Sequence, residues 1–321
     1  MQPMVSVCCV TYNHADTIAE TLDAFLVQAA DLPIEILVHD DCSTDGTQEI
    51  LERYAAAHPD VIFPLFETEN QYSRGVAMDA TFNFPRARGE YIALCEGDDL
   101  WDDPHKLQKQ VAAMRAHSDA TFCFTNGTVH DVSGQQPDRA FLPYYESERA
   151  AYRPESCELT LGEVSQWSFL PTASFLFPTA ALAKVPREML LRPCPYGDLR
   201  LKLLLTAVGK AYYLCERTCV YRLNSAGSTM ATWGSDAPEK LRRRCAQALA
   251  MLADVDRLSG GAYHDALQVL MDSHTRALVQ GAPTPSLLRQ PDARRVLRAL
   301  PLPKRIKCRV KALIPDAWLT Q

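Results

Sequence analysis

Short apolar runs alternate with amphipathic stretches over the first hundred residues. A short continuous apolar run is typical of a buried strand, whereas apolar residues three and four positions apart are typical of a helix. The predicted strands are residues 5–10, 34–38, 61–66 and 91–95, and the predicted helices are 16–28, 44–57 and, with a weaker pattern, 76–84. Strand followed by helix, repeated, predicts an α/β fold with a mostly parallel sheet.

The pattern loosens in the middle of the chain and becomes helical towards its end. The middle part has predicted helices at 104–117 and 198–208 and strand-like segments at 120–132, 169–177, 211–214 and 218–221. Three helical patterns then follow at 239–256, 262–279 and 287–300. The change of composition near Ser235 predicts an α/β domain at residues 1–235 and a helical C-terminal extension at residues 236–321.

Polar residues collect where three of the predicted strands end. They are Thr11-Tyr12-Asn13, Asp40-Asp41 and Glu96-Gly97-Asp98-Asp99. Because α/β sheets bind ligands outside the carboxyl ends of their strands, we expect these residues to face one crevice. Crowded carboxylates repel one another unless they are neutralised, and Mg²⁺ or Mn²⁺ carrying a substrate phosphate would neutralise them. The alternative is an acidic surface turn in which Asp103 caps a helix that begins at Pro104.

The net charge of −6 conceals an asymmetry along the chain. Residues 284–321 include nine basic and two acidic residues and so carry +7, which leaves −13 on the residues before them. Apolar residues are interleaved with these basic ones. The tail could therefore lie on an anionic membrane surface, or it could be a solvated helix that packs on the acidic body.

Composition restricts the class and location of the protein. No apolar run is long enough to span a membrane, and the first residues do not resemble a signal peptide. The 11 cysteines include no CxxC pair, which predicts neither a disulfide framework nor a zinc site. We expect a cytoplasmic protein that could be peripheral on the inner face of the plasma membrane. The acidic body argues against a nucleic-acid partner.

Three motifs together resemble the family 2 glycosyltransferases. The first is Val5-Ser6-Val7 leading into Thr11-Tyr12-Asn13, and the second runs from His39 to Thr47. The third and most distinctive runs from Arg88 to Trp101 and continues through Asp103-Pro104 and Lys106-Leu107. The resemblance covers about residues 4 to 235. It implies the GT-A fold, a Rossmann-like sheet flanked by helices, and inverting sugar transfer from a nucleotide diphosphate sugar.

The resemblance also implies roles for individual residues. Asp98 would contact the ribose or sugar of the donor and share with Asp99 the binding of Mn²⁺ or Mg²⁺ on the diphosphate. Thr11, Tyr12 and Asn13 would seat the nucleotide.

A carboxylate at the second strand end can accept a hydrogen bond from the imide of uracil, and Asp41 is our choice over Asp40. Both aspartates could instead cap the following helix. Asp198 resembles the catalytic base that deprotonates the acceptor hydroxyl, although it would serve equally well as a helix N-cap.

Further candidate contacts lie in or near the same motifs. Glu96 could join the cation site or bind the sugar. Trp101 and the aromatic residues of 167–177 could stack on acceptor sugar rings or belong to the core. Asn224 stands where the family often has a histidine that contacts the metal or diphosphate. Arg222 could bind phosphate or a structural carboxylate.

These observations lead to one hypothesis and two alternatives. We expect an inverting, metal-dependent glycosyltransferase that uses a UDP-sugar, with a glycan or lipid-linked glycan as acceptor, in the assembly of cell-surface polysaccharide or lipopolysaccharide. One alternative is a module that binds nucleotide sugars without turnover, and Asn224 is its only support. The other is a nucleotidyltransferase, but residues 11–16 lack the basic, glycine-rich loop that would receive a triphosphate.

Overall fold

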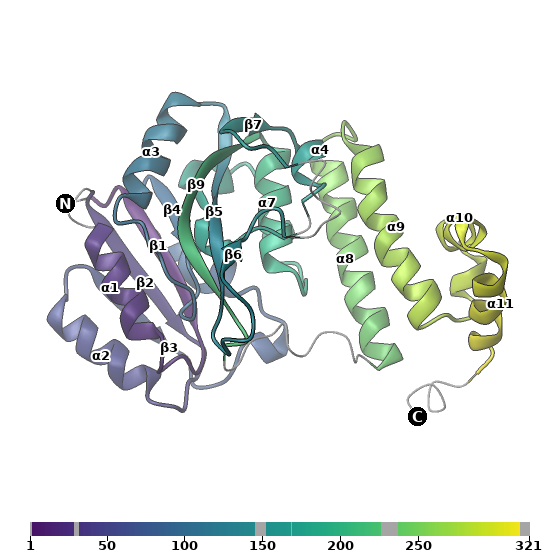
Figure 1. Cartoon of the computed structure of the whole chain (residues 1–321), viewed down its shortest axis with the longest axis horizontal. Helices are drawn as coiled ribbons and strands as arrows, with labels where there is room; N and C mark the ends of the chain where they lie inside the picture. The colour runs from purple at the N-terminus through teal and green to yellow at the C-terminus, as the bar shows by residue number, and fades with distance from the viewer. Residues whose placement is uncertain (1, 29–31, 145–151, 168, 226–236, 315–321) are drawn as a thin grey trace. The chain divides into compact units, whose positions relative to one another are not determined.

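The computed structural model describes residues 2–28, 32–144, 152–167, 169–225 and 237–314. The chain divides into two compact units. One consists of Met1–Arg192 and Gly197–Ser228, and the other of Pro193–Tyr196 and Thr229–Gln321. The first contains the β-sheet, and the second is helical (Figure 1).

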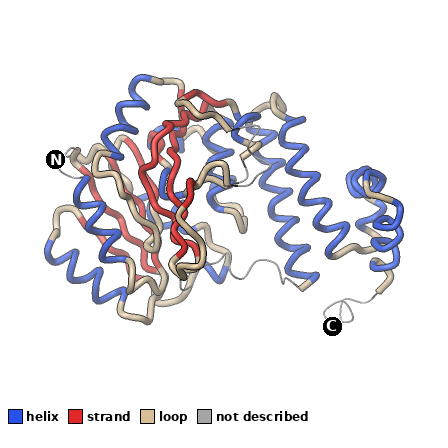
Figure 2. Tube along the Cα trace, viewed as in Figure 1, coloured by secondary structure: helices blue, strands red, loops and turns tan. Residues whose placement is uncertain are grey.

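A mixed β-sheet forms the centre of the first unit, and Figure 2 shows its strands in red. In spatial order the strands are β3 (Ile62–Phe66), β2 (Ile34–Asp40), β1 (Val5–Thr11), β4 (Tyr91–Leu94), β8 (Leu176–Pro178), β5 (Ala120–Asp131), β9 (Lys210–Leu223) and β7 (Cys157–Leu159), and β6 (Arg139–Ala140) pairs with β5. Strands β1 to β4 are parallel, and β8 runs antiparallel to β4 and β5. The predicted α/β class is therefore confirmed.

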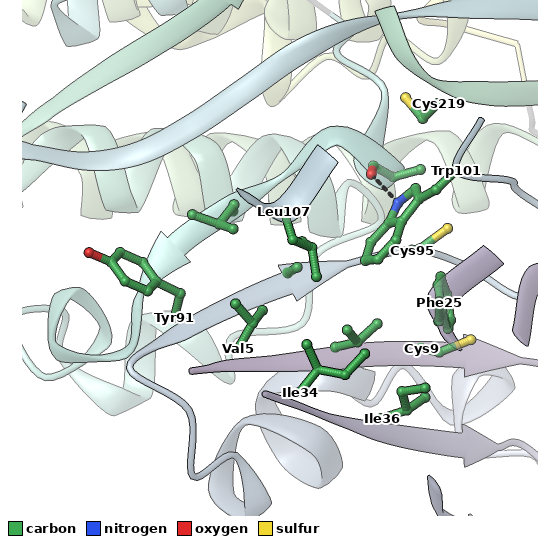
Figure 3. Close-up of a cluster of buried hydrophobic side chains, with 14 of the residues drawn as sticks. Val5, Cys9, Phe25, Ile34, Ile36, Tyr91, Cys95, Trp101, Leu107 and Cys219 are labelled. Atoms are coloured by element: carbon green, nitrogen blue, oxygen red, sulfur yellow. Dashed lines mark hydrogen bonds between the residues drawn. The ribbon is translucent and has the colours of Figure 1, made fainter. Parts of the chain in front are cut away.

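The parallel strands β1, β2 and β4 are buried along almost their whole length, whereas only the first residue of the edge strand β3 is buried. Every residue of β2 and β4 is buried, as are six of the seven residues of β1. Continuous apolar runs of this kind form where both faces of a parallel sheet are covered. Figure 3 shows part of the resulting core, in which Phe25 and Leu107 from two helices lie with Val5, Ile34 and Ile36 from the strands.

The helices of the first unit connect the strands and complete this core. The longer ones are α1 (Ile18–Gln28), α2 (Thr47–Ala57), α3 (Lys106–Ala116) and α7 (Gly197–Ala207), and the short ones are α4 (Leu161–Val164), α5 (Thr179–Leu182) and α6 (Arg187–Leu190). Single helical turns are η1 (Tyr72–Arg74), η2 (Asp79–Asn83), η3 (Phe84–Arg86) and η5 (Thr172–Ser174). In α1, the buried residues Ile18, Leu22 and Phe25 recur at helical spacing, so one stripe of this helix faces the core.

The strand register brings the predicted polar loops to one edge of the sheet. Thr11 at the end of β1 lies opposite Asp40 at the end of β2, and Cys8 of β1 lies opposite Leu94 at the end of β4. The loops that follow these strands therefore leave the sheet on the same side, as the sequence predicts for a ligand site.

Several predicted elements differ from those observed. Segments 211–214 and 218–221 form one strand, β9, whose register with β5 shifts at bulges, so the polar residues between them do not end the strand. Most of 169–177 is loop and the turn η5, and only its end enters β8. Helix α3 begins at Lys106 and not at Pro104, although the Asp103 carboxylate accepts a bond from the backbone N–H of His105 (2.9 Å).

The second unit consists of helices. They are α8 (Pro238–Leu258), α9 (His264–Gly281), α10 (Pro291–Ala299) and α11 (Leu302–Lys311), with a single turn η7 (Leu287–Arg289) before α10. The predicted helix at 287–300 is thus divided, because Pro291 occupies the first helical position of α10. Val279, Ala293, Leu297, Leu300 and Cys308 form a small apolar core. None of the helices described is both long and apolar enough to cross a membrane.

Candidate active site

The acidic loop, which we define as Glu96–Asp99, follows β4 and is fixed through its backbone. The N–H of Gly97 donates to the carbonyl of Val10 in β1 (2.9 Å). Two threonine hydroxyls of the β1–α1 region donate to the loop, from Thr17 to the Gly97 carbonyl (2.9 Å) and from Thr21 to the Asp99 carbonyl (2.7 Å). The loop backbone is therefore held in place without using its carboxylates.

Arg222 of β9 holds the other side of the acidic loop. Its Nη1 donates to the backbone carbonyl of Asp98 (3.0 Å), and its Nη2 pairs with the carboxylate of Glu20 in α1. Its backbone N–H points at Oδ1 of Asp99 (3.4 Å). Of the two roles considered for Arg222, these contacts support the structural one, in which the guanidinium links β9, α1 and the acidic loop.

Gly97 allows the loop to approach β1 closely. A Cβ atom added to this glycine would lie 2.6 Å from Oγ1 of Thr11 and 2.9 Å from Nδ1 of His14. Such distances are well inside van der Waals contact, so any side chain here would push the loop away from the strand end. The glycine thus sets where Glu96, Asp98 and Asp99 lie.

Carboxylates from three parts of the first unit influence one another at this place. Protein around Glu96 displaces water and raises its pKa well above the usual value, although the residue keeps solvent access. The charges of Asp98, Asp99, Asp198 and Asp79 raise it further. Burial, followed by the charge of Asp98, raises the pKa of Asp99 in the same way, although the backbone bond and charge of Arg222 oppose the shift. A cation bound at this place would offset the repulsion between these negative charges.

Asp98 and Asp99 have different surroundings. Asp99 is buried, whereas Asp98 is half-buried and its Oδ2 accepts a hydrogen bond from the hydroxyl of Ser225 (3.1 Å). Nε2 of His14 lies 3.9 Å from the same oxygen, and its other ring nitrogen is 3.2 Å from Oγ1 of Thr11. The residues after β1 and β9 therefore meet around the Asp98 carboxylate.

Asp198 lies in the first turn of α7 and contributes the most distant carboxylate of the group in sequence. Burial raises its pKa, whereas the charge of Lys202 one turn later and a bond from the Leu199 backbone lower it. Lys202 is itself fully buried, and its ammonium group donates to the carbonyl of Trp167. A carboxylate with a raised pKa is better suited to accept a proton near neutral pH than an ordinary aspartate.

Comparison with known proteins identifies the family. A family model described as glycosyl transferase family 2 matches residues 6–161. Over these residues, which are slightly less than half of the chain, the protein is a family 2 glycosyltransferase. Among curated relatives, the uncharacterized protein Rv1520 of Mycobacterium tuberculosis is 41% identical over 122 residues, which cover 37% of this chain and 34% of that protein. The chain thus spans about a third of the length of the first curated relatives it matches.

A relative with a described activity is also similar over part of its length. The Escherichia coli UDP-Glc:alpha-D-GlcNAc-diphosphoundecaprenol beta-1,3-glucosyltransferase WfaP is 34% identical over 123 residues, covering 38% of this chain and 45% of that protein.

Solved structures show the fold over the whole chain. TarS 1-349 of S. aureus, in complex with UDP-GlcNAc, has a TM-score of 0.58 at 16% identity and covers 98% of this chain and 90% of its own. The mannosyltransferase PcManGT of Pyrobaculum calidifontis, in complex with GDP-Man and Mn²⁺, has a TM-score of 0.56 at 20% identity and covers 100% and 84%. Both have the GT-A fold, and so does this chain.

The predicted nucleotide residues of this family 2 chain lie together in the loops after β1 and β2. Thr11 is buried, whereas Tyr12 is exposed. Asn13 has a left-handed backbone (φ 55°), its N–H donates to the Ser43 hydroxyl (2.8 Å), and its side-chain oxygen accepts from the N–H of Thr44 (2.8 Å). These bonds join the two loops into one surface.

Asp40 and Asp41 make different contacts at the end of β2. The carboxylate of Asp41 accepts bonds from the backbone N–H groups of Gln71 (2.7 Å) and Tyr72 (3.0 Å), so it holds the loop that follows β3. Oδ1 of Asp40 accepts from the N–H of Ser43 (3.0 Å) and from Nε2 of Gln48 (2.6 Å), so it holds the turn before α2, whereas the N-cap position of that helix is Gly46. The contact between Asp41 and uracil stays a prediction, and it would have to use the remaining lone pairs of the carboxylate.

The sugar contact that we expected for Trp101 is wrong. Trp101 is only 3% exposed, its indole N–H donates to the Ala173 carbonyl (2.7 Å), and its ring packs against Phe25 (Figure 3). Trp167 and Phe175 are likewise buried, so the aromatic residues of 167–177 belong mainly to the core. Aromatic side chains that find partners in the fold have no face left for a sugar.

The side chain of Asn224 also has an internal partner. Its amide donates to the carboxylate of Asp131 in β5 (2.9 Å), and its backbone is left-handed (φ 64°) at the point where β9 ends. Asparagine tolerates this conformation better than most residues. The observed contact therefore gives Asn224 a role in the turn that precedes Ser225.

Asp79 was missed by the sequence analysis. It lies in the turn η2, where its carboxylate accepts a bond from the side chain of Asn83 (2.9 Å). Burial raises its pKa to about 6, and the bond from Asn83 and the charge of Arg200 limit the rise. The only local signal was an Asp/Asn pair four residues apart in a weak helical pattern, which does not reveal that other carboxylates lie near.

The close approach of Gly97 to β1 predicts the effect of Gly97→Ala. The added Cβ should clash with Thr11 and His14, and we expect the free energy of unfolding in urea to fall by about 1–3 kcal/mol. Gly197→Ala is the matched control, because nothing lies within 4 Å of its Cβ position. Equal stability of Gly97→Ala and wild type would show that the loop is not confined as described.

The raised pKa of Asp79 predicts a pH-dependent effect of Asp79→Asn. A folded-state pKa near 6 means that the folded protein binds this proton more tightly than the unfolded chain, so ionisation of Asp79 destabilises the fold as pH rises through 6. The asparagine variant should gain about 2 kcal/mol relative to wild type between pH 4 and pH 8. Urea unfolding at both pH values measures it, and a pH-independent difference would contradict the assignment.

Proposed function

We propose that the protein transfers a sugar from a nucleotide diphosphate sugar to a hydroxyl group, with inversion at the anomeric carbon. The observation that supports this most is that the charge of Asp198 acts on Glu96 of the acidic loop, which follows β4 at the carboxyl edge of the sheet. The two ends of the group suit two tasks. The acidic loop can hold the diphosphate end of a donor through a cation, and Asp198 can take a proton.

The cofactor we propose is Mn²⁺ or Mg²⁺, held by Asp99 and Asp98. In the part of the chain that the structure describes, no three side chains form a ready metal site. The two carboxylates nevertheless fit such an ion, because Mg²⁺ is usually bound by one or two carboxylates together with substrate phosphates. A bound cation would neutralise the negative charge that grows on the leaving diphosphate. The related fold of PcManGT contains Mn²⁺.

We propose Asp198 as the base that accepts the proton of the acceptor hydroxyl. Its carboxylate is half-buried and its pKa is raised by burial, so it holds a proton more readily than a solvated aspartate. The charge of Lys202 opposes this rise and so favours the ionised form of Asp198 that can accept a proton. Asp198 is the second residue of α7 and accepts from the next N–H, that of Leu199, whereas an N-cap side chain accepts from an N–H two or three residues later.

The donor we propose is a UDP-sugar. Thr11, Tyr12, Asn13 and Asp41 would contact the nucleotide, and Asp98 and Glu96 would contact the ribose or sugar. TarS binds UDP-GlcNAc and WfaP uses UDP-Glc according to their names, which supports uridine, whereas PcManGT binds GDP-Man.

The acceptor we propose is a glycan or lipid-linked glycan in the assembly of cell-surface polysaccharide or lipopolysaccharide. The name of WfaP describes transfer to a diphosphoundecaprenol-linked sugar, which supports this class. Such acceptors are made at the membrane, and a peripheral position there would bring enzyme and acceptor together. Such a position at the membrane would depend on residues outside the active site.

A nucleotide-sugar-binding module without turnover is the alternative, and site variants separate it from an enzyme. Asp198→Asn keeps shape but cannot accept a proton, so we expect turnover of a UDP-sugar to fall about 100-fold or more with little change in UDP affinity. Asp99→Asn should instead weaken Mn²⁺-dependent UDP binding. Release of UDP from a screen of UDP-sugars measures turnover, and calorimetry measures binding.

Asp119→Asn is the control, because this carboxylate is exposed and its partner is Lys210. If the wild-type protein binds UDP-sugars tightly but releases no UDP with any acceptor or with water, the module is correct and the enzyme is not.

The surroundings of Asp198 predict the acid side of the pH profile. The base works only when ionised, so turnover should rise with pH through a pKa above that of an ordinary aspartate. Removing the charge of Lys202 in Lys202→Met should raise this pKa and move the half-maximal point of kcat/KM to higher pH. An unchanged acid limb in a folded Lys202→Met variant would show that Asp198 is not the group that titrates.

A further inference from the structure

Helix α11 has one buried face and one exposed apolar face. Cys308 and Ala312 face the interior of the second unit and are 4% and 9% exposed. On the other side, Leu302, Ile306, Val310 and Leu313 are 66%, 55%, 55% and 78% exposed. At 100° per residue Leu302, Ile306 and Val310 project within about 80° of one another around the helix, and Leu313 follows in the turn after it. We call these four residues the α11 stripe.

The α11 stripe is a concentration of exposed apolar side chains that the rest of the described chain does not repeat. Ten large apolar residues are exposed, and five of them lie between Leu302 and Ile314. The others, such as Val269 on α9 and Val132 after β5, are scattered along the sequence. Single exposed apolar residues are normal, whereas a contiguous set with polar neighbours marks a surface that binds something.

Cations border the stripe on both edges. Around the helix, Arg309 projects on one edge and Lys307 on the other, and Lys304 lies beyond Lys307. All three are exposed, and none has an ion pair within the residues that the structure describes. The sequence contains no aspartate or glutamate from residue 293 to 315, so no acidic side chain of this stretch neutralises them.

The other two cations of α11 are used within the unit. Nε of Arg305 donates to the Leu300 carbonyl (2.6 Å), and Nζ of Lys311 donates to the Gly281 carbonyl (2.7 Å). They hold the helix to the preceding elements by satisfying carbonyls near the ends of α10 and α9. Arg305 and Lys311 therefore belong to the face of α11 that packs on its own unit, and not to its exposed face.

We propose that the α11 stripe docks on an anionic lipid bilayer, with the helix lying in the plane of the interface. Apolar side chains would enter the headgroup and acyl boundary, and Lys307 and Arg309 at the edges of the stripe would reach lipid phosphates. A second copy of the chain is a poorer occupant, because stripe-to-stripe packing would bring the cations of both copies together. The proposal goes beyond the transfer reaction and does not depend on the residues of the acidic loop.

Flotation with lipid vesicles tests the proposal on the full chain. We expect binding to vesicles of phosphatidylcholine mixed with phosphatidylglycerol, weak binding to phosphatidylcholine alone, and loss of binding as salt increases. The stripe variant Ile306→Ser/Val310→Ser and the charge variant Lys307→Glu/Arg309→Glu should each lower the partition coefficient about tenfold or more.

Val269→Ser is the matched control, because Val269 is 70% exposed on another helix of the same unit and has no place in the stripe. It should bind vesicles as wild type does, and so should Asp198→Asn, which separates docking from the proposed reaction. The stripe and charge positions and Val269 are exposed, so thermal unfolding of these variants should be unchanged.

Three results would overturn the proposal. The first is wild-type protein that stays unbound with anionic vesicles, and the second is a stripe variant that binds them as well as wild type. The third is a dimer, detected by light scattering, that Ile306→Ser/Val310→Ser abolishes, because the stripe would then be covered by a second copy.

Discussion

Repulsion between carboxylates on a loop that cannot move is the constraint on which the site depends. Thr17 and Thr21 bind the carbonyls of the acidic loop from one side, and Arg222 binds it from the other. Because these bonds use backbone groups, Asp98 and Asp99 keep lone pairs for a ligand, but their charges cannot separate. Burial, followed by the charge of Asp98, raises the pKa of Asp99. A polyvalent ligand that brings a cation relieves this repulsion, so the fold is organised for the ligand before the ligand arrives.

Hydrogen bonds also join the loops around the site to one another, and not only to Asp98 and Asp99. Asn13 joins the loops after β1 and β2, Asp41 holds the loop after β3, and Asn224 fixes the turn after β9. Each polar group that satisfies another loop lowers the freedom of the whole edge of the sheet. Several residues with nucleotide-binding roles by resemblance therefore also have structural roles, and a variant at any of them would change both.

The sequence predicts β1, β2 and β4 well because they are covered on both faces, which makes each a mostly apolar run. The sequence also identifies Glu96, Asp98, Asp99 and Asp198 as candidate site residues, because strand ends and helix starts have local sequence signals. What it fails to predict depends on contacts distant in sequence. The bulges of β9 reflect its pairing with β5, and Trp101 is buried because Ala173 and Phe25 reach it. Asp79 joins the carboxylates only through the tertiary fold.

In the second unit the sequence pattern fits two different structures equally well. Its alternation of basic and apolar residues allows either a packed helix or a membrane surface, and the two readings differ only in which apolar residues are inside. Arg305 and Lys311 decide this by turning to the carbonyls of Leu300 and Gly281, which places Cys308 inside. The larger residues at 302, 306, 310 and 313 are then left outside. This helix buries a cysteine and an alanine but exposes leucine, isoleucine and valine to water. Covering its outer face with an apolar surface would therefore lower the free energy of the protein.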